Sequence, residues 1–157
     1  MNTFTTDEAV LPTRGGDWYD GGLWQDVFLH KWGTKNDLVK GSWDYLYRVI
    51  AQANKSLDKL NEILAKDPEN TSVPKYISEV RAFRALYYYY LLDMFARVPL
   101  VTSSTTAMAD VEQSERSVVF TFVKTELEES VADLSDAHSN LPGEYYGRIT
   151  KPVAYFL

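Results

Sequence analysis

The chain has 157 residues, of which 45% are hydrophobic and 14% aromatic, and it carries a formal net charge of −6. This length suits one domain with its own core, the hydrophobic content excludes a disordered chain, and no apolar stretch approaches the ~20 residues of a membrane-spanning helix. The acidic balance argues against a nucleic-acid-binding protein, and the absence of cysteine excludes thiol nucleophiles, disulfides and thiolate metal sites.

The first 36 residues show no sustained helical or strand period, and they hold five of the eight glycines. The paired glycines at 15–16 and 21–22 permit tight turns, so we expect an ordered surface loop with a short helix over 23–31. Three of the four tryptophans lie in this least regular part of the chain, namely Trp18, Trp24 and Trp32.

From residue 37 onward, apolar residues recur at spacings of three and four, which predicts amphipathic helices. The first helix is expected over about 38–66. The second is expected to begin after Ser72, its N-cap, and to end at Val98-Pro99. After a linker of small and polar residues, a third helix is expected from Ser117 into the stretch 133–142, and a fourth from Thr150.

Helices joined by short connections pack as antiparallel hairpins, so we expect these helices to share one core. The expected core comprises Trp43, Tyr47, Ile50, Phe83, Leu86, Tyr87, Val123 and Leu127. On the third helix, Phe120 is expected to face inward and Glu126 outward. Arg81 and Arg84 are expected to anchor carboxylates or helix ends, and Asn54 to form an interhelical hydrogen bond.

Residues that could carry catalysis are sparse. The two histidines, His30 and His138, lack a metal-ligand spacing, and the sequence has no phosphate-binding glycine loop and no nucleophile elbow. The carboxylate pairs at 128–129 and 133/136 are typical of a solvated helix face. The aspartates at 17, 20 and 26 are expected to form turns rather than to gather calcium. We therefore expect no enzymatic activity, no cofactor and no metal site.

Five segments occur in the order that is typical of one protein family. They are Thr6-Asp7-Glu8-Ala9-Val10 with the Arg14-Gly15-Gly16-Asp17-Trp18 run, residues 43–54, residues 78–100 with Arg84-Ala85-Leu86-Tyr87 and Val98-Pro99-Leu100, residues 116–142, and Gly147-Arg148-Ile149-Thr150. Together they resemble the SusD/RagB family of helical, surface-anchored glycan-binding lipoproteins. The chain departs from the family pattern at Ala96, where a glycine is usual.

The resemblance implies an all-α, tetratricopeptide-like fold of antiparallel helix pairs. Within residues 1–157, it implies an irregular loop region rich in glycine and tryptophan (1–36) and a helical region (37–157). We expect the chain to be the N-terminal part of a longer SusD-like domain.

The functional implication is a non-enzymatic, cell-surface glycan-binding protein of the outer membrane, lipid-anchored in its full-length form. It would assist oligosaccharide uptake through a SusC-like TonB-dependent transporter, and its partners would include no nucleic acid. The alternative is a tetratricopeptide-like scaffold that binds a protein partner without affinity for sugar.

Residues 14–32 form the strongest candidate for a binding site. Aromatic rings can stack on the apolar face of a sugar, and planar polar side chains can bind its hydroxyls. The candidate glycan-binding residues are Trp24, Trp32, Trp18, Tyr19, Arg14 and Asp17. The structural alternative is that the tryptophans pin the loop onto the helices. Because its neighbours match the family motif, Trp18 is the more structural candidate, and Trp24 and Trp32 are the preferred ligand residues.

Overall fold

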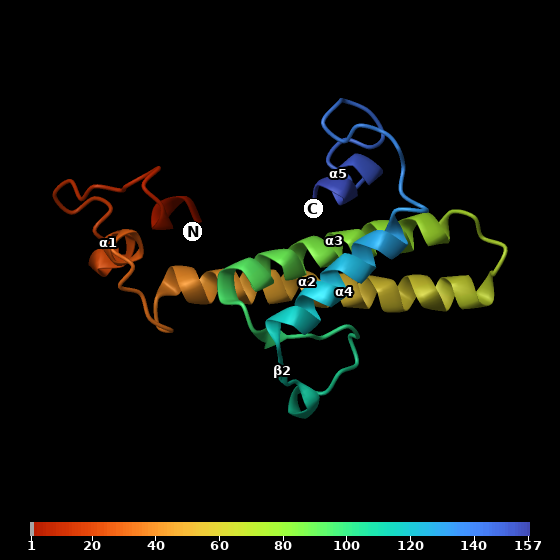
Figure 1. Cartoon of the computed structure of the whole chain (residues 1–157), viewed down its shortest axis with the longest axis horizontal. Helices are drawn as coiled ribbons and strands as arrows, with labels where there is room; N and C mark the ends of the chain where they lie inside the picture. Colours follow the sequence, from red (N-terminus) through yellow and green to blue (C-terminus); the bar gives the residue numbers. More distant parts are fainter. Residues whose placement is uncertain (1) are drawn as a thin grey trace. The chain divides into compact units, whose positions relative to one another are not determined.

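The computed structural model describes residues 2–157, which are mostly helical (Figure 1). The α-helices in this range are α1 (Leu23–Phe28), α2 (Asp37–Lys66), α3 (Val73–Phe95), α4 (Arg116–Ser130) and α5 (Lys151–Phe156). Short 3-10 turns occupy η1 (Asn2–Thr5), η2 (Asp20–Gly22) and η3 (Met108–Asp110). The expected all-α class is confirmed. None of these helices has the length and apolar character that crossing a bilayer requires.

The chain divides into two compact units, Met1–Tyr45 and Leu46–Leu157, which we call the loop unit and the helical unit. In the loop unit, α1 contacts both η1 and η2. Helix α1 ends at Phe28, earlier than expected, and the Asn36 side-chain oxygen then caps α2 by accepting the backbone N–H groups of Leu38 and Val39 at 3.0 and 3.3 Å.

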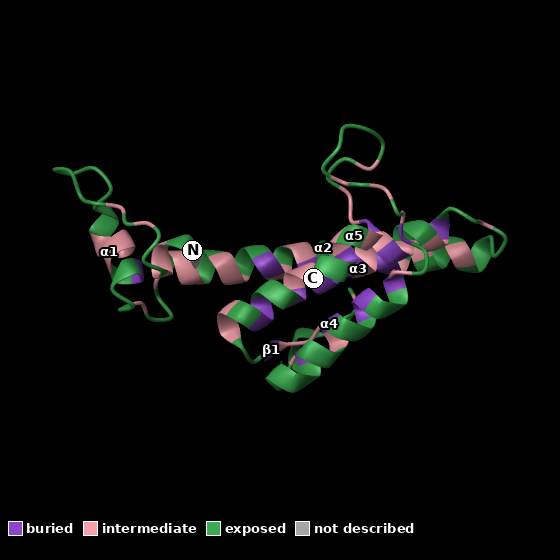
Figure 2. Ribbon diagram, turned by 45° about the horizontal axis from the view of Figure 1, so that its top comes forward, coloured by how far each residue is buried: buried purple, intermediate pink, exposed green. Residues whose placement is uncertain are grey.

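In the helical unit, α3 packs against α4 and runs antiparallel to the part of α2 that begins at Leu46 (Figure 1). The buried apolar side chains of this unit include Leu46, Ile50, Ala53, Leu57, Ala82, Ala85, Tyr88, Leu91, Val98, Val119, Val123 and Leu127. Figure 2 shows the buried positions gathered along the facing sides of these helices. The predicted burial of Ile50, Val123 and Leu127 is confirmed.

Two aromatic residues of the expected inward faces are instead exposed. Phe83 on α3 is 38% exposed, and Phe120 on α4 is 58% exposed. On α3 the fully buried positions include Ala82 and Ala85, because small side chains allow two helices to approach closely. A run of consecutive tyrosines cannot reveal this choice, since it places aromatic rings on every side of the helix.

The third helix is shorter than predicted: α4 ends at Ser130 and turns follow it. Serine side chains bond locally to the backbone here. The Ser130 hydroxyl donates to the carbonyl of Glu126 at 2.6 Å, and the Ser135 hydroxyl accepts the N–H of Ala137 at 3.1 Å. Such local bonds compete with helix propagation.

Helix α3 is capped by a different residue from the one expected. Ser72 makes no side-chain cap bond, and the Asn70 side-chain oxygen accepts the N–H groups of Ser72 and Val73, each at 3.1 Å. Thr150 precedes α5, but its buried hydroxyl likewise makes no cap bond. At the other end of α3, Ala96 adopts a φ of 60°.

The connection between α3 and α4 contains the antiparallel pair of β1 (Val98–Pro99) and β2 (Gln113–Ser114), with Val98 opposite Ser114. This pair was not predicted. Two phenols hold the start of the connection on the helices: Tyr47 donates to the carbonyl of Pro99 at 2.7 Å, and the hydroxyl of Tyr88 both donates to and accepts from the backbone of Val101.

Candidate functional site

Trp18 and Tyr19 lie next to a tight backbone turn in the loop unit. Arg14 and Asp17 exchange two backbone hydrogen bonds across this turn, at 3.2 and 3.0 Å. Trp18 and Asp20 then adopt φ values of 59° and 40°, a left-handed conformation that costs a non-glycine residue about 1–3 kcal/mol. The side chains of Trp18 and Tyr19 remain 54% and 55% exposed. A strained backbone therefore presents two neighbouring aromatic side chains, which we call the platform.

The platform is supported from within the loop unit by Trp24 on α1. The ring of Trp24 makes edge-to-face contacts with Trp18, at 6.1 Å between centroids, and with Phe4, at 5.1 Å. Its indole N–H donates to Oδ2 of Asp20 at 2.8 Å. Edge-to-face pairs contribute about 0.5–1.5 kcal/mol beyond the burial of their surface. Trp24 is half-buried, and it contacts two rings and a carboxylate. These contacts support the Trp18 side of the platform.

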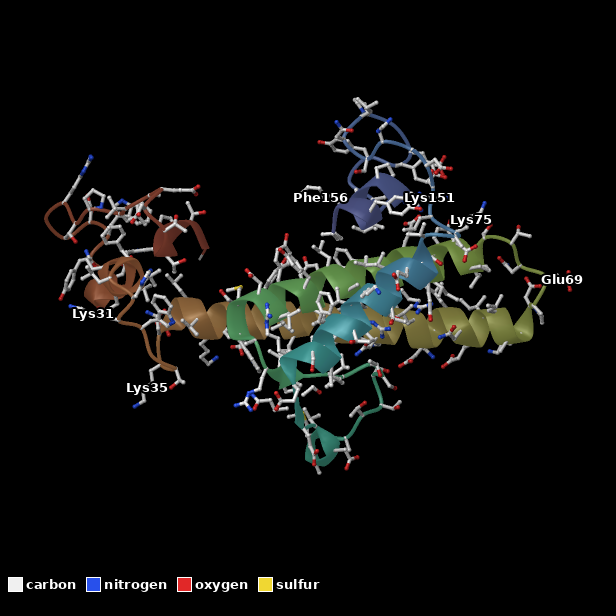
Figure 3. The ribbon with its side chains drawn as sticks, viewed as in Figure 1. Lys31, Lys35, Glu69, Lys75, Lys151 and Phe156 are labelled. Carbon is white, nitrogen blue, oxygen red and sulfur yellow. The ribbon has the colours of Figure 1, made fainter. Side chains whose placement is uncertain are left out.

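A polar pocket of about 310 Å³ lies beside Trp32. It is lined by Asp20, Gly21, Leu23, Asp26, Lys31, Trp32, Gly33, Lys35, Asn36 and Asp37, of which Figure 3 labels the two lysines. Trp32 is half-buried and packs edge-on against His30, with 5.3 Å between the ring centroids. The Nε2 atom of His30 lies 2.8 Å from the carbonyl oxygen of Thr5, which fixes this ring in place. The volume is at the lower end of the range for ligand pockets.

The structure joins four of the residues singled out from the sequence in two pairs and places a fifth in the polar pocket. Arg14 pairs with Asp17, and Trp18 contacts Trp24, whereas Trp32 lines the polar pocket. Sequence reasoning missed Asp20 as a member of the site, although it both holds Trp24 and lines the pocket. Its only sequence signal was its place among the loop aspartates. Within residues 2–157, no three acidic or histidine side chains gather in a way that could hold a metal ion.

The two arginines of α3 meet a buried carboxylate in the helical unit. Nε and Nη2 of Arg84 donate to Oε2 of Glu126 at 3.2 and 2.5 Å, and Nε and Nη2 of Arg81 donate to Oε1 at 3.0 and 2.7 Å. Nη1 of Arg84 also donates to Oδ1 of Asn54 at 2.7 Å. The expected roles of these arginines and of Asn54 are confirmed. The outward placement of Glu126 was wrong, because two arginines from another helix satisfy its charge inside the protein.

The phenols of Tyr47 and Tyr88 also hold the fold of the helical unit together. Burial raises the pKa of Tyr47 and, despite its hydrogen bonds to Val101, raises that of Tyr88 to about 12. Both groups therefore remain neutral near pH 7, where they hold the α3–α4 connection in place.

An apolar groove of about 520 Å³ lies among α3, α4 and α5. It is lined by Tyr89, Leu92, Arg116, Phe120, Val123, Lys124, Leu127, Glu128, Val131, Ala154, Tyr155 and Leu157. The side chains of Phe120 and Tyr155 are largely exposed. The groove offers apolar area with few polar groups, which suits contact with another polypeptide segment better than binding of a sugar.

Comparison with known families identifies one match along nearly the whole chain. A SusD-like family, described as starch-binding and associating with the outer membrane, matches residues 2–156. A search of curated proteins finds no match.

Solved structures show the same fold. A laminarin-binding SusD-like protein is 27% identical, with a TM-score of 0.74 over 87% of this chain and 28% of that protein. A SusD-like carbohydrate-binding protein from Bacteroides fragilis is also 27% identical, with a TM-score of 0.67 over 79% of this chain and 24% of the other. Surface glycan-binding protein A from Bacteroides uniformis, at 22% identity and a TM-score of 0.69, shares the fold over 85% of this chain and 29% of its own. The chain thus spans less than a third of the length of these proteins.

Proposed function

The chain belongs to the SusD-like family, and on that basis we propose that it binds glycans through the platform of Trp18 and Tyr19. The observation that carries this proposal is the exposure of both rings on a turn in which the backbone of Trp18, and of Asp20 just after Tyr19, is held at positive φ. Strain of this kind persists only where the surrounding structure maintains it, and it is concentrated at functional sites. An exposed indole offers a flat apolar face to the C–H groups of a sugar ring.

The polar neighbours of the platform supply the hydrogen bonds that a sugar requires. Arg14 and Asp17 are exposed and lie on the turn that leads into Trp18, so the same segment supplies a guanidinium donor and a carboxylate acceptor. The pocket beside Trp32 would take a second sugar ring of the same chain. In this arrangement Trp18 binds the ligand, and Trp24 orients the side chain of Trp18. From the sequence we preferred the opposite assignment, with Trp24 as a ligand residue and Trp18 as the structural one.

We further propose that the protein acts at the outer membrane, lipid-anchored at the cell surface, and delivers oligosaccharide to a SusC-like TonB-dependent transporter. The support for this part is membership in a family described as associating with the outer membrane. Co-purification of the protein with such a transporter from detergent-solubilised membranes is the test. Recovery of the protein without the transporter would remove this partner.

The platform is tested by measuring affinity and melting temperature on the same variants. Trp18→Ala should weaken binding on a glycan array, or retardation in a laminarin affinity gel, by about 1–3 kcal/mol, by analogy with aromatic stacking on bases. Its melting temperature should change little, because half of the side chain is exposed. Trp24→Ala should lower the melting temperature as well as the affinity, because it removes two ring contacts and a hydrogen bond.

Tyr146→Ala is the matched control, since this exposed aromatic side chain lies in the helical unit. It should leave both quantities unchanged. Wild-type affinity in a folded Trp18→Ala variant would refute the platform.

A second candidate function, the binding of a protein partner without sugar affinity, is favoured by the apolar groove. The two functions separate cleanly. Phe120→Ser, on the rim of the groove, should abolish co-purification of a protein partner and leave the glycan array unchanged, whereas Trp18→Ala should do the opposite. A protein that binds no glycan but loses its partner with Phe120→Ser is a scaffold.

A further inference from the structure

We propose that the glycan site of the loop unit selects neutral sugars and rejects acidic ones. This inference rests on the proposed function and names the class of ligand that the site takes. It follows from the position and the sign of the charges around the platform and the Trp32 pocket.

The charges beside the platform do not provide a binding site for an anion. Arg14 is the basic residue of the turn, and it stands opposite Asp17 in the backbone bridge. Asp17 and Asp20 thus supply two carboxylates beside Trp18 and Tyr19 against the one guanidinium of Arg14. The formal charge of this short segment is therefore negative, and Asp20 adjoins Tyr19 directly.

The carboxylate of Asp20 is held in place, and it connects the two parts of the site. Its Oδ2 atom accepts the indole N–H of Trp24 at 2.8 Å, and Trp24 in turn contacts Trp18. The same residue lines the pocket beside Trp32. A glycan that covers the platform and enters the pocket therefore passes close to a fixed negative charge.

The side chains that line the pocket beside Trp32 also carry a net negative charge. Lys31 and Lys35 are outnumbered by the carboxylates of Asp20, Asp26 and Asp37. Acidic side chains also outnumber basic ones in the loop unit as a whole. Hydroxyl groups can donate hydrogen bonds to these carboxylates, whereas a uronate or a sulfate is an acceptor with a like charge.

The expected discrimination follows from the Coulomb energy. Two like charges 4 Å apart in water weaken binding by about fivefold, and a lower effective dielectric constant at the protein surface increases the factor. Salt reduces it, because the Debye length is about 10 Å at 0.1 M ionic strength. The selectivity should therefore be largest at low salt and should decline as salt is added.

The experiment uses the full chain and a glycan array in matched pairs. Each pair contains a neutral oligosaccharide of glucose or mannose and its C6-carboxylated or sulfated derivative, read at 20 mM and 500 mM NaCl. We expect the neutral member to bind at least fivefold more tightly at 20 mM, with a smaller ratio at 500 mM. Equal or tighter binding of the acidic members would overturn the selectivity and leave the proposed function standing. Absence of binding to every glycan would overturn both.

Asp20→Asn tests the residue that carries the argument. Asparagine keeps an oxygen acceptor for Trp24 and tolerates the left-handed backbone at this position, so the variant removes the charge and little else. The ratio of acidic to neutral affinity should rise about fivefold. Glu112→Gln, which removes an exposed carboxylate of the helical unit, is the control and should leave that ratio unchanged. If Asp20→Asn leaves the ratio of acidic to neutral affinity unchanged, the role of Asp20 is refuted. Any selectivity of the wild type against acidic glycans then comes from other groups.

Discussion

Replacing Glu126 by glutamine should destabilise the helical unit more than any other single-charge change in the network of Arg81, Arg84 and Glu126. The side chains of Glu126 and Arg84 are each only 7% exposed, and they meet at 2.5 Å. Loss of the negative charge leaves the guanidinium of Arg84 buried without a counter-charge, which costs about 3–5 kcal/mol. Glutamine retains one oxygen acceptor, so we expect about 3 kcal/mol. That is a large part of a typical stability of about 5–15 kcal/mol.

The same network contains a matched control. Glu129 also accepts a hydrogen bond from Arg81, at 2.5 Å, but its side chain is 56% exposed. An exposed ion pair contributes about 0–1 kcal/mol, so Glu129→Gln should cost no more than that. Urea unfolding followed by circular dichroism gives the free energy of unfolding of each variant, compared at an unchanged m-value. Equal losses in the two variants would refute the reasoning that burial determines the cost.

Four further substitutions test the packing of α3 and its connections. Tyr88→Phe removes two hydrogen bonds to Val101 and should lower the free energy of unfolding by about 1–3 kcal/mol, as measured in urea. Burial raises the pKa of Tyr88 from 10.0 to about 12. The contribution of Tyr88 to the free energy of unfolding is therefore complete below pH 10 and is lost as the pH rises toward about 12. Tyr88→Phe should accordingly lose less stability than the wild type over this alkaline range. Ala96→Gly should raise the free energy of unfolding by about 1 kcal/mol, since a φ of 60° strains alanine and not glycine; a lower melting temperature would contradict this. Leu91→Ala, at a fully buried site, should lower the free energy of unfolding by about 2–5 kcal/mol. Leu86→Ala, at a half-buried site, should lower it clearly less. A lower melting temperature for Leu86→Ala than for Leu91→Ala would show that the core is placed wrongly.

The departure from the family pattern, Ala96, falls at a position with a positive φ. The resemblance to the SusD/RagB family includes a glycine at this position, and the structure places a positive φ there. Glycine adopts this conformation without steric cost, which explains why the pattern prefers it at the exit of a helix. The alanine of this chain keeps the conformation because Val98, which is fully buried, holds the next segment on the core.

The sequence by itself determined the features that depend on local spacing. The apolar residues of α2 recur at intervals of three and four, and Leu46, Ile50, Ala53 and Leu57 are buried as that period requires. The concentration of tryptophan among paired glycines likewise led us to predict a binding site in residues 14–32, and this site remains a prediction. These signals are readable because each depends on neighbours within one or two turns of the chain.

Only the tertiary structure decided which side chains face one another. Glu126 is buried because Arg84 approaches it from 42 positions earlier in the chain, a distance that no local pattern reports. Trp18 and Trp24 have the same side chain and lie six positions apart, yet contacts with Phe4 and Asp20 partly cover one and leave the other exposed. Exposure depends on the contacts that a side chain makes after folding, and local sequence specifies the residue type but not those contacts.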